Sequence, residues 1–143
     1  VGCAQLKKLP LFVAGRRRNF DRLRQGMQPV ADKFILPEPL AGSRPSWFGF
    51  MLTCRHGISR DSVVRYLEAK GIQTRMLFAG NIVRQPCFDE LRDGSAGYRI
   101  AGSLSNTDRI MQDTFWVGVY PGLTDAQIDY IVRMLKEAVK NEG

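Results

Sequence analysis

Apolar positions recur with helical spacing at both ends of the chain. In the first 27 residues, large apolar side chains return every three or four positions with basic residues between them, which predicts an amphipathic helix. Pro10 should kink this helix or stand in the first turn of a second one. Near the other end, Thr124 and Gln127 form a capping box in front of an apolar stripe from Ile128 to Val139. The pattern therefore predicts a helix at each end.

Between these helices the apolar runs are short and bounded by Gly and Pro, as is typical of strands. We expect strands over residues 34–36, 47–52, 72–78 and 115–119. Ser59 is placed to cap a helix that runs to Lys70, and Gly71 is placed to end it. Asn106 or Ser105 is placed to cap a further helix that runs through Gln112. Strands and helices that alternate irregularly in this way indicate a two-layer α+β domain.

The stretch 79–103 is rich in Gly, Pro and polar residues. We expect a long loop there, with one helical turn near residues 88–91. Loops of this length in a compact domain are usually functional.

Composition indicates one folded domain. The 143 residues are 44% hydrophobic and 24% charged, which is ordinary for a globular chain. No apolar run approaches the ~20 residues of a membrane span.

The chain starts without Met and already inside a helical pattern, so we expect a domain cut from a longer protein. Cys3, Cys54 and Cys87 are an odd number at wide spacing, which suits a reducing cytoplasm.

The net charge of +7 is concentrated near the N-terminus. The basic residues of this region are Lys7, Lys8, Arg16, Arg17, Arg18, Arg22 and Arg24. Three interpretations remain open: the solvated face of a helix, a contact with nucleotide phosphate, or the surface of a small basic nucleic-acid-binding module. The aromatic ladder and the Cys/His spacing of common nucleic-acid-binding modules are absent from the sequence.

The residue spacing alone supports no enzyme assignment. The chain has a single histidine, His56, and no Cys-x-x-Cys pair, so no metal-ligand set is predicted. Phosphate-binding glycine loops and nucleophile elbows are also missing. We therefore expect no catalytic residue and no metal ligand in this chain.

Three blocks of sequence do carry a resemblance: Pro45–Phe50, Thr74–Pro86 and Asn106–Thr124. In this order they resemble the C-terminal part of the sugar-nucleotide aminotransferase and dehydratase family, which belongs to fold type I of the vitamin B6 enzymes. Gly2–Pro10 resembles the junction helix of that family. Leu77–Asn81 stands where the aminotransferases commonly have a His-Tyr-Pro type sequence, and this departure favours the dehydratase branch.

Within that branch the blocks resemble in particular the CDP-4-dehydro-6-deoxyglucose 3-dehydratases of lipopolysaccharide O-antigen biosynthesis. A GDP-sugar 3-dehydratase and a sugar-nucleotide aminotransferase remain as alternatives. The resemblance implies a small C-terminal domain with three or four mostly antiparallel strands and helices packed on one face. It divides the chain into a junction helix region, 1–28, and the small domain, 29–143.

The resemblance also implies a reaction for the parent enzyme. Pyridoxamine phosphate would remove the C3 hydroxyl of a CDP-linked 4-keto-6-deoxyhexose, with electrons from a [2Fe-2S] cluster and a partner reductase. In this family the cofactor-binding residues, the His base and the cluster cysteines precede the segment that this chain resembles. We therefore expect a homodimeric parent, a missing N-terminal large domain, and no cofactor binding or activity in this chain alone.

The part of the substrate site that this chain should contribute lies between Arg75 and Gln85. Arg75 is expected to contact a substrate phosphate or form a structural ion pair, and Phe78 to form an apolar wall or simply to pack. Asn81 follows Gly80 and is either a hydrogen-bond partner of a sugar hydroxyl or a turn former. Gln85 completes the predicted substrate-binding set. We also expect an exposed apolar patch that includes part of the first helix and Trp47 or Phe48.

Overall fold

The strands form one antiparallel sheet. The structure, a computed structural model, describes residues 2–92 and 99–140. Its four-stranded sheet has the order β1-β2-β4-β3, with every neighbouring pair antiparallel. The strands are β1 Phe34–Ile35, β2 Gly49–Cys54, β3 Thr74–Met76 and β4 Thr114–Gly118. The mostly antiparallel sheet implied by the family resemblance is confirmed.

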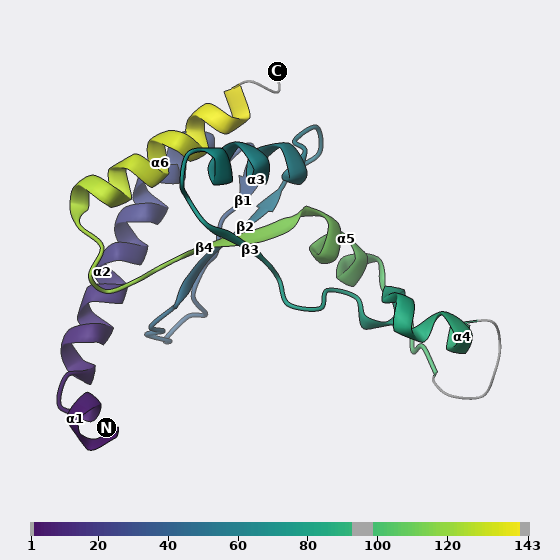
Figure 1. Cartoon of the computed structure of the whole chain (residues 1–143), viewed down its shortest axis with the longest axis horizontal. Helices are drawn as coiled ribbons and strands as arrows, with labels where there is room; N and C mark the ends of the chain where they lie inside the picture. The colour runs from purple at the N-terminus through teal and green to yellow at the C-terminus, as the bar shows by residue number, and fades with distance from the viewer. Residues whose placement is uncertain (1, 93–98, 141–143) are drawn as a thin grey trace.

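The helices divide between two sides of the molecule. They are α1 Gly2–Leu6, α2 Leu9–Met27, α3 Arg60–Ala69, α4 Asp89–Arg92, α5 Ser105–Asp113 and α6 Asp125–Lys140. Single turns of 3-10 helix occur at η1 Gln28–Val30, η2 Ile82–Arg84 and η3 Pro86–Phe88. The helices α2, α3 and α6 gather beside the sheet, whereas the segment with α4 and α5 projects away from α2 and α6 (Figure 1). The domain is a two-layer α+β fold, as the pattern predicts.

The alternation of buried and partly buried residues along β2 shows which face of the sheet is covered. Phe50, Leu52 and Cys54 are buried while the residues between them are only partly covered, because successive side chains of a strand point to opposite faces. The buried set packs with side chains from β4, α2, α3 and α6. Fully buried members include Leu23, Met27, Val63, Leu67, Phe115, Ile128 and Leu135. Each such side chain contributes roughly 1.5–3 kcal/mol by leaving water.

The N-terminal apolar stripe is covered along only part of its length. Pro10 stands in the first turn of α2, directly after the break between α1 and α2, which is one of the two outcomes expected. Phe20 and Leu23 are buried in the core, but Leu6 is 66% and Leu11 76% exposed. The apolar side chains before Phe12 therefore form part of an exposed surface, as predicted for the first helix.

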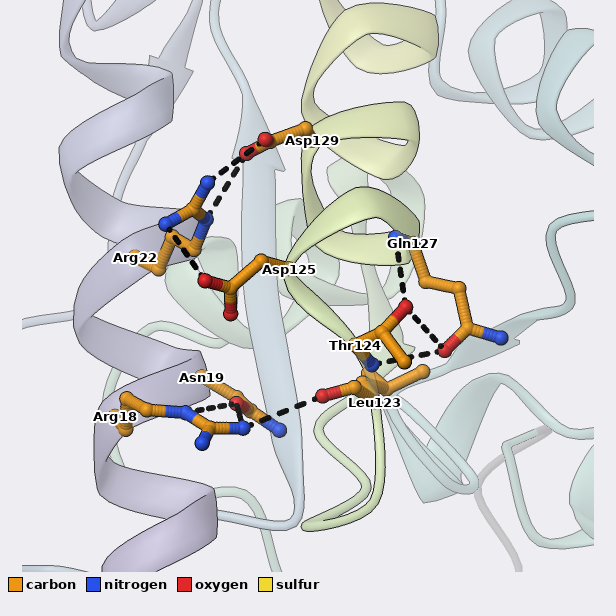
Figure 2. Close-up of polar contacts among 8 residues, drawn as sticks. All are labelled: Arg18, Asn19, Arg22, Leu123, Thr124, Asp125, Gln127 and Asp129. Atoms are coloured by element: carbon orange, nitrogen blue, oxygen red, sulfur yellow. Dashed lines mark hydrogen bonds and ion pairs between the residues drawn. The ribbon is translucent and has the colours of Figure 1, made fainter.

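Helix α2 is fastened to the start of α6 by polar contacts (Figure 2). Arg22 lies 2.7 Å from an oxygen of Asp129 and 3.4 Å from one of Asp125. The buried amide of Asn19 donates to the backbone oxygen of Tyr120 at 2.7 Å. Hydrogen bonding and attraction from Arg22 hold the pKa of the Asp129 carboxyl below its usual value. The two helices thus dock through both apolar and charged groups.

Further contacts of the α2 side chains change the interpretation of the basic N-terminal region. Arg17 donates to the backbone oxygens of residues 44 and 45, and Arg18 to Asn19 and to the oxygen of Leu123. Arg24 lies 2.8 Å from Glu38. Guanidinium groups held by acceptors of their own chain are poor candidates for a free cationic face. This favours a structural role for the basic helix over nucleic-acid binding.

Local signals predicted element ends well where the cap is made within a few residues. Ser59 accepts from the backbone N of Ser62, and Gly71 follows α3 at φ +75°. The capping box of Thr124 and Gln127 is also present. The predicted cap of α5 by Ser105 or Asn106 is wrong: Ser105 is the first residue of the helix, Leu104 holds the N-cap position, and no side chain caps it.

Two strand predictions need correction. β2 runs from Gly49 to Cys54, two residues later than expected at both ends. β3 starts at Thr74, two residues late, and it ends at Met76, before Phe78. The reason for the early end of β3 is that Phe78 has φ +47°, which lies outside the extended region. The predicted loop 79–103 contains η2, η3 and α4, and its residues 93–98 lie outside the described part of the chain.

Candidate functional site

The face of the sheet that α2, α3 and α6 leave uncovered carries a row of paired residues. Trp116 of β4 pairs with Met51 of β2 on one side and with Arg75 of β3 on the other. Residues directly opposite each other share a face, so Arg75 lies beside the indole on the uncovered face. This row is the floor of the candidate site.

An apolar pocket of about 350 Å³ opens on this face. Its walls come from three segments: the run before β2, the start of β2 with β4, and the residues after β3. The lining residues are Pro45, Ser46, Trp47, Phe48, Gly49, Met51, Leu77, Phe78 and Trp116. None of them is charged. Concave apolar pockets of this size class are the usual binding places of small molecules.

Glycine at position 49 allows the tryptophan to lie against the strand. A Cβ atom built on Gly49 would come within 2.8 Å of the Trp116 ring. The ring of Phe48 meets the same indole edge to face, with 5.3 Å between centroids. Phe48 is nevertheless 57% exposed. Phe48 is thus exposed, as expected for a member of the predicted apolar patch, and it forms one side of the pocket; the patch as a whole stays a prediction.

Two polar atoms at the pocket lack partners. Ser46 Oγ and Trp47 Nε1 are buried with no hydrogen-bond partner among the described residues. Buried polar groups in native proteins nearly always have a partner. The Trp47 ring packs against Phe20 of the core at 5.2 Å between centroids, so its N–H is enclosed by the protein.

Arg75 and Phe78 lie at the margin of the pocket. Arg75 is exposed, and its charge adds to the hydrogen bonds from Thr74 that hold the pKa of the Glu68 carboxyl below its usual value. Phe78 is 79% exposed although its ring lines the pocket. Both are available to a ligand on this face.

Asn81 and Gln85 are placed differently, because their side chains bond within the loop. Asn81 is only 2% exposed. Its Nδ2 donates to Asp108 at 2.6 Å, and its Oδ1 accepts from the backbone N of Val83 at 3.3 Å. Gln85 Nε2 donates to the backbone oxygen of Ala79 at 2.6 Å. Their predicted contact with a sugar stays a prediction; in this structure they shape the loop.

Sequence reasoning did not single out Trp116 or Asp108. Trp116 was expected only as a strand residue, since its face depends on the register with β2. Asp108 was expected only as a helix residue, since its partner Asn81 lies 27 positions earlier. Neither position carries a local signal.

The pocket does not fit a pyridoxal or pyridoxamine phosphate. A phosphate group needs converging cations or N–H donors, and the pocket is lined by no charged side chain.

Among residues 2–92 and 99–140, no group of three or more His, Cys, Asp or Glu side chains could hold a metal ion. Cys3 and Cys87 are exposed and Cys54 is buried. The described helices also include none long and apolar enough to span a membrane.

The fold occurs in solved structures of vitamin B6 enzymes. One is Escherichia coli GDP-4-keto-6-deoxy-D-mannose-3-dehydratase with bound hydrated PLP, which superposes with a TM-score of 0.80 at 26% identity over 94% of this chain and 33% of that one. An aminotransferase, TlmJ from Streptoalloteichus hindustanus, shares the fold with a TM-score of 0.80 at 24% identity, over 98% of this chain and 35% of that one. The model of the DegT/DnrJ/EryC1/StrS aminotransferase family matches residues 1–136. The chain belongs to this family.

Two curated relatives are more similar in sequence. Lipopolysaccharide biosynthesis protein RfbH of Salmonella typhimurium is 46% identical over 138 residues, which is 95% of this chain and 30% of that protein. The dTDP-4-dehydro-2,6-dideoxy-D-glucose 3-dehydratase of Saccharopolyspora spinosa is also 46% identical, over 95% of this chain and 29% of that enzyme. The chain thus spans about 30% of the length of these relatives.

Proposed function

We propose that this chain is the C-terminal domain of a pyridoxamine-phosphate-dependent 3-dehydratase that acts on a nucleotide-linked 4-keto-6-deoxyhexose in O-antigen deoxysugar biosynthesis. The observation that carries the proposal is the 46% identity to two longer relatives, one named for lipopolysaccharide biosynthesis and one a sugar-nucleotide 3-dehydratase. CDP is the proposed nucleotide. The relatives named for dTDP- and GDP-linked sugars define the alternatives, and the aminotransferase branch is a further one.

The preceding part of such a parent would hold the cofactor, the base and the proposed [2Fe-2S] cluster. When bound, pyridoxamine phosphate supplies the amine that condenses with the sugar ketone. Residues 1–28 would connect the two domains, and the exposed side chains of Leu6 and Leu11 would pack against the larger one. A homodimeric, cytoplasmic parent and a partner reductase complete the proposal. The chain alone would be inactive.

This chain would contribute one wall of the substrate cleft. The uncovered face offers an apolar pocket with a cation, Arg75, on the adjacent strand. A nucleotide sugar combines a flat base, apolar ring faces and a diphosphate, which matches that pairing. Phe78 would contact the sugar or base and Arg75 the diphosphate. Asn81 and Gln85, in the loop after Phe78, would complete the substrate-binding set.

Steady-state kinetics of the full-length parent test this wall. Arg75→Ala and Phe78→Ala should each raise KM for the nucleotide sugar about tenfold, since a charge-assisted hydrogen bond or a buried aromatic contact contributes roughly 1.5–3 kcal/mol. Arg65→Ala and Leu40→Ala are matched controls, because both residues are exposed and neither lines the pocket. If the two pairs of variants have the same KM for the nucleotide sugar, the uncovered face is not part of the substrate site.

A further inference from the structure

The loop after β3 is held by one short face of α5. Asp108 accepts a hydrogen bond from Asn81 Nδ2 at 2.6 Å. Its other oxygen lies 3.1 Å from Arg84 Nη2. One turn further along α5, the sulfur of Met111 lies 3.4 Å from the backbone N of Asn81. Two side chains of one helix therefore fix the chain on both sides of Asn81.

The same helix face fixes the backbone before Asn81. Gly80 has φ +62°, and a Cβ atom there would overlap Met111 Cγ and lie 2.9 Å from Met111 Cβ. The loop thus passes directly against α5 at this residue. Only glycine allows this approach and this backbone angle together.

Phe78 lies two residues before Gly80, next to the anchored segment. Its φ of +47° is unfavourable for a side chain with a Cβ. Its ring is 79% exposed, so burial of the ring does not compensate for this angle. The local contacts are a bond from its own N to the oxygen of Met76 at 2.8 Å and one from the N of Gly80 to the oxygen of Leu77 at 3.1 Å. A strained, exposed residue persists only where the surrounding chain fixes it.

We infer that Asp108 is a positioning residue for the substrate site: its carboxylate fixes Asn81 and Arg84 and thereby holds Phe78 at the rim of the apolar pocket. This inference rests on the proposed function, because the pocket takes substrate only if the parent acts on a nucleotide sugar. The Asp108 side chain is 24% exposed and its contacts are with the loop. It acts through Phe78 and not on the substrate itself.

The charge of Asp108 is part of the anchor. The hydrogen bonds from Arg84 and Asn81 hold the pKa of this carboxyl below its usual value. The carboxylate therefore remains ionised, and both of its oxygens stay acceptors, at neutral pH.

Hydrogen exchange on the 143-residue chain tests the anchor without any substrate. Asp108→Ala should speed exchange of the backbone N–H groups of Val83, Arg84 and Gln85 about tenfold, because these groups bond within the turn that Asn81 begins. Asp113→Ala is the matched control: it removes a carboxylate from the same helix that lies 3.9 Å from Arg109. Equal exchange in the two variants would overturn the anchoring role.

Kinetics of the full-length parent test the consequence for substrate. Asp108→Ala should raise KM for the nucleotide sugar about tenfold with kcat within about twofold, and the melting temperature should stay close to that of Asp113→Ala. Asp108→Asn keeps an acceptor oxygen and should lie between Asp108→Ala and wild type. Faster exchange with unchanged KM would overturn the inference and leave the proposed function standing. A wild-type parent without 3-dehydratase activity would instead remove the proposed function, while the exchange result would still decide the anchor.

Discussion

Replacing Gly80 with alanine should destabilise the chain more than the same change at another glycine of positive φ. At φ +62° an L-residue costs about 1–2 kcal/mol. The new methyl group would also overlap Met111, and overpacking of this kind costs about 1–3 kcal/mol. The sum is about 2–5 kcal/mol. Since Met111 is flexible, the lower half of that range is expected.

Gly71→Ala is the matched control. Gly71 has φ +75° with no atom within 4 Å of a built Cβ, so the substitution carries the backbone cost alone, about 1–2 kcal/mol. Urea unfolding of the 143-residue chain, followed by tryptophan fluorescence, gives both values. Hydrogen exchange of the loop N–H groups is measured in the same two variants, because the loop can detach from α5 before the core unfolds.

A double-mutant cycle isolates the contact. In a Met111→Ala background the extra loss of stability that Gly80→Ala causes over Gly71→Ala should shrink, since Met111 Cγ and the sulfur have gone while the Cβ atom at 2.9 Å remains. If Gly80→Ala loses no more stability than Gly71→Ala, and loop exchange is equally slow in both, the close packing of the loop on α5 is refuted.

Two further predictions concern the cofactor and the helix contact of Figure 2. The isolated chain, incubated with pyridoxal or pyridoxamine phosphate or reconstituted with iron and sulfide, should show no stoichiometric visible chromophore; such a band would contradict the expectation that this chain alone binds no cofactor. The lowered pKa of Asp129 is caused by Arg22, so its stabilisation is present above the unfolded carboxylate pKa of about 3.9 and is lost as pH falls through the lower folded value. The difference in melting temperature between wild type and Arg22→Ala should therefore shrink as pH is lowered from about 6 to about 2.5, and a difference independent of pH would show that this ion pair does not contribute.

The features that could be predicted from the sequence are those that depend on residues a few positions apart in the chain. The cap at Ser59, the stop at Gly71 and the capping box at Thr124 each depend on residues within a few positions, and all three are present. The exposure of Phe48 was expected for a different reason, since a domain that packs against a larger partner should keep an apolar patch.

The site needed the structure because its contacts are distant in sequence. Trp116 becomes the floor of the pocket only through its register with Met51 and Arg75. Asn81 looked available for a ligand because it follows Gly80 in a loop, yet its partner Asp108 lies beyond the whole segment 82–104. The positive φ of Phe78, which ends β3 early, likewise depends on how the loop is held and has no local sequence signal.

Product analysis of the full-length parent tests the central claim most directly. The purified enzyme, with pyridoxamine phosphate and a reducing system, would be given 4-keto-6-deoxyhexose linked to CDP, dTDP or GDP in separate reactions, and the products analysed by mass spectrometry and NMR. We predict loss of the C3 hydroxyl, greatest with the CDP sugar, and no turnover by a parent that lacks this domain. A 4-amino sugar formed from an amino donor, or no 3-deoxy product with any of the three nucleotides, would contradict the assignment of this chain to a 3-dehydratase.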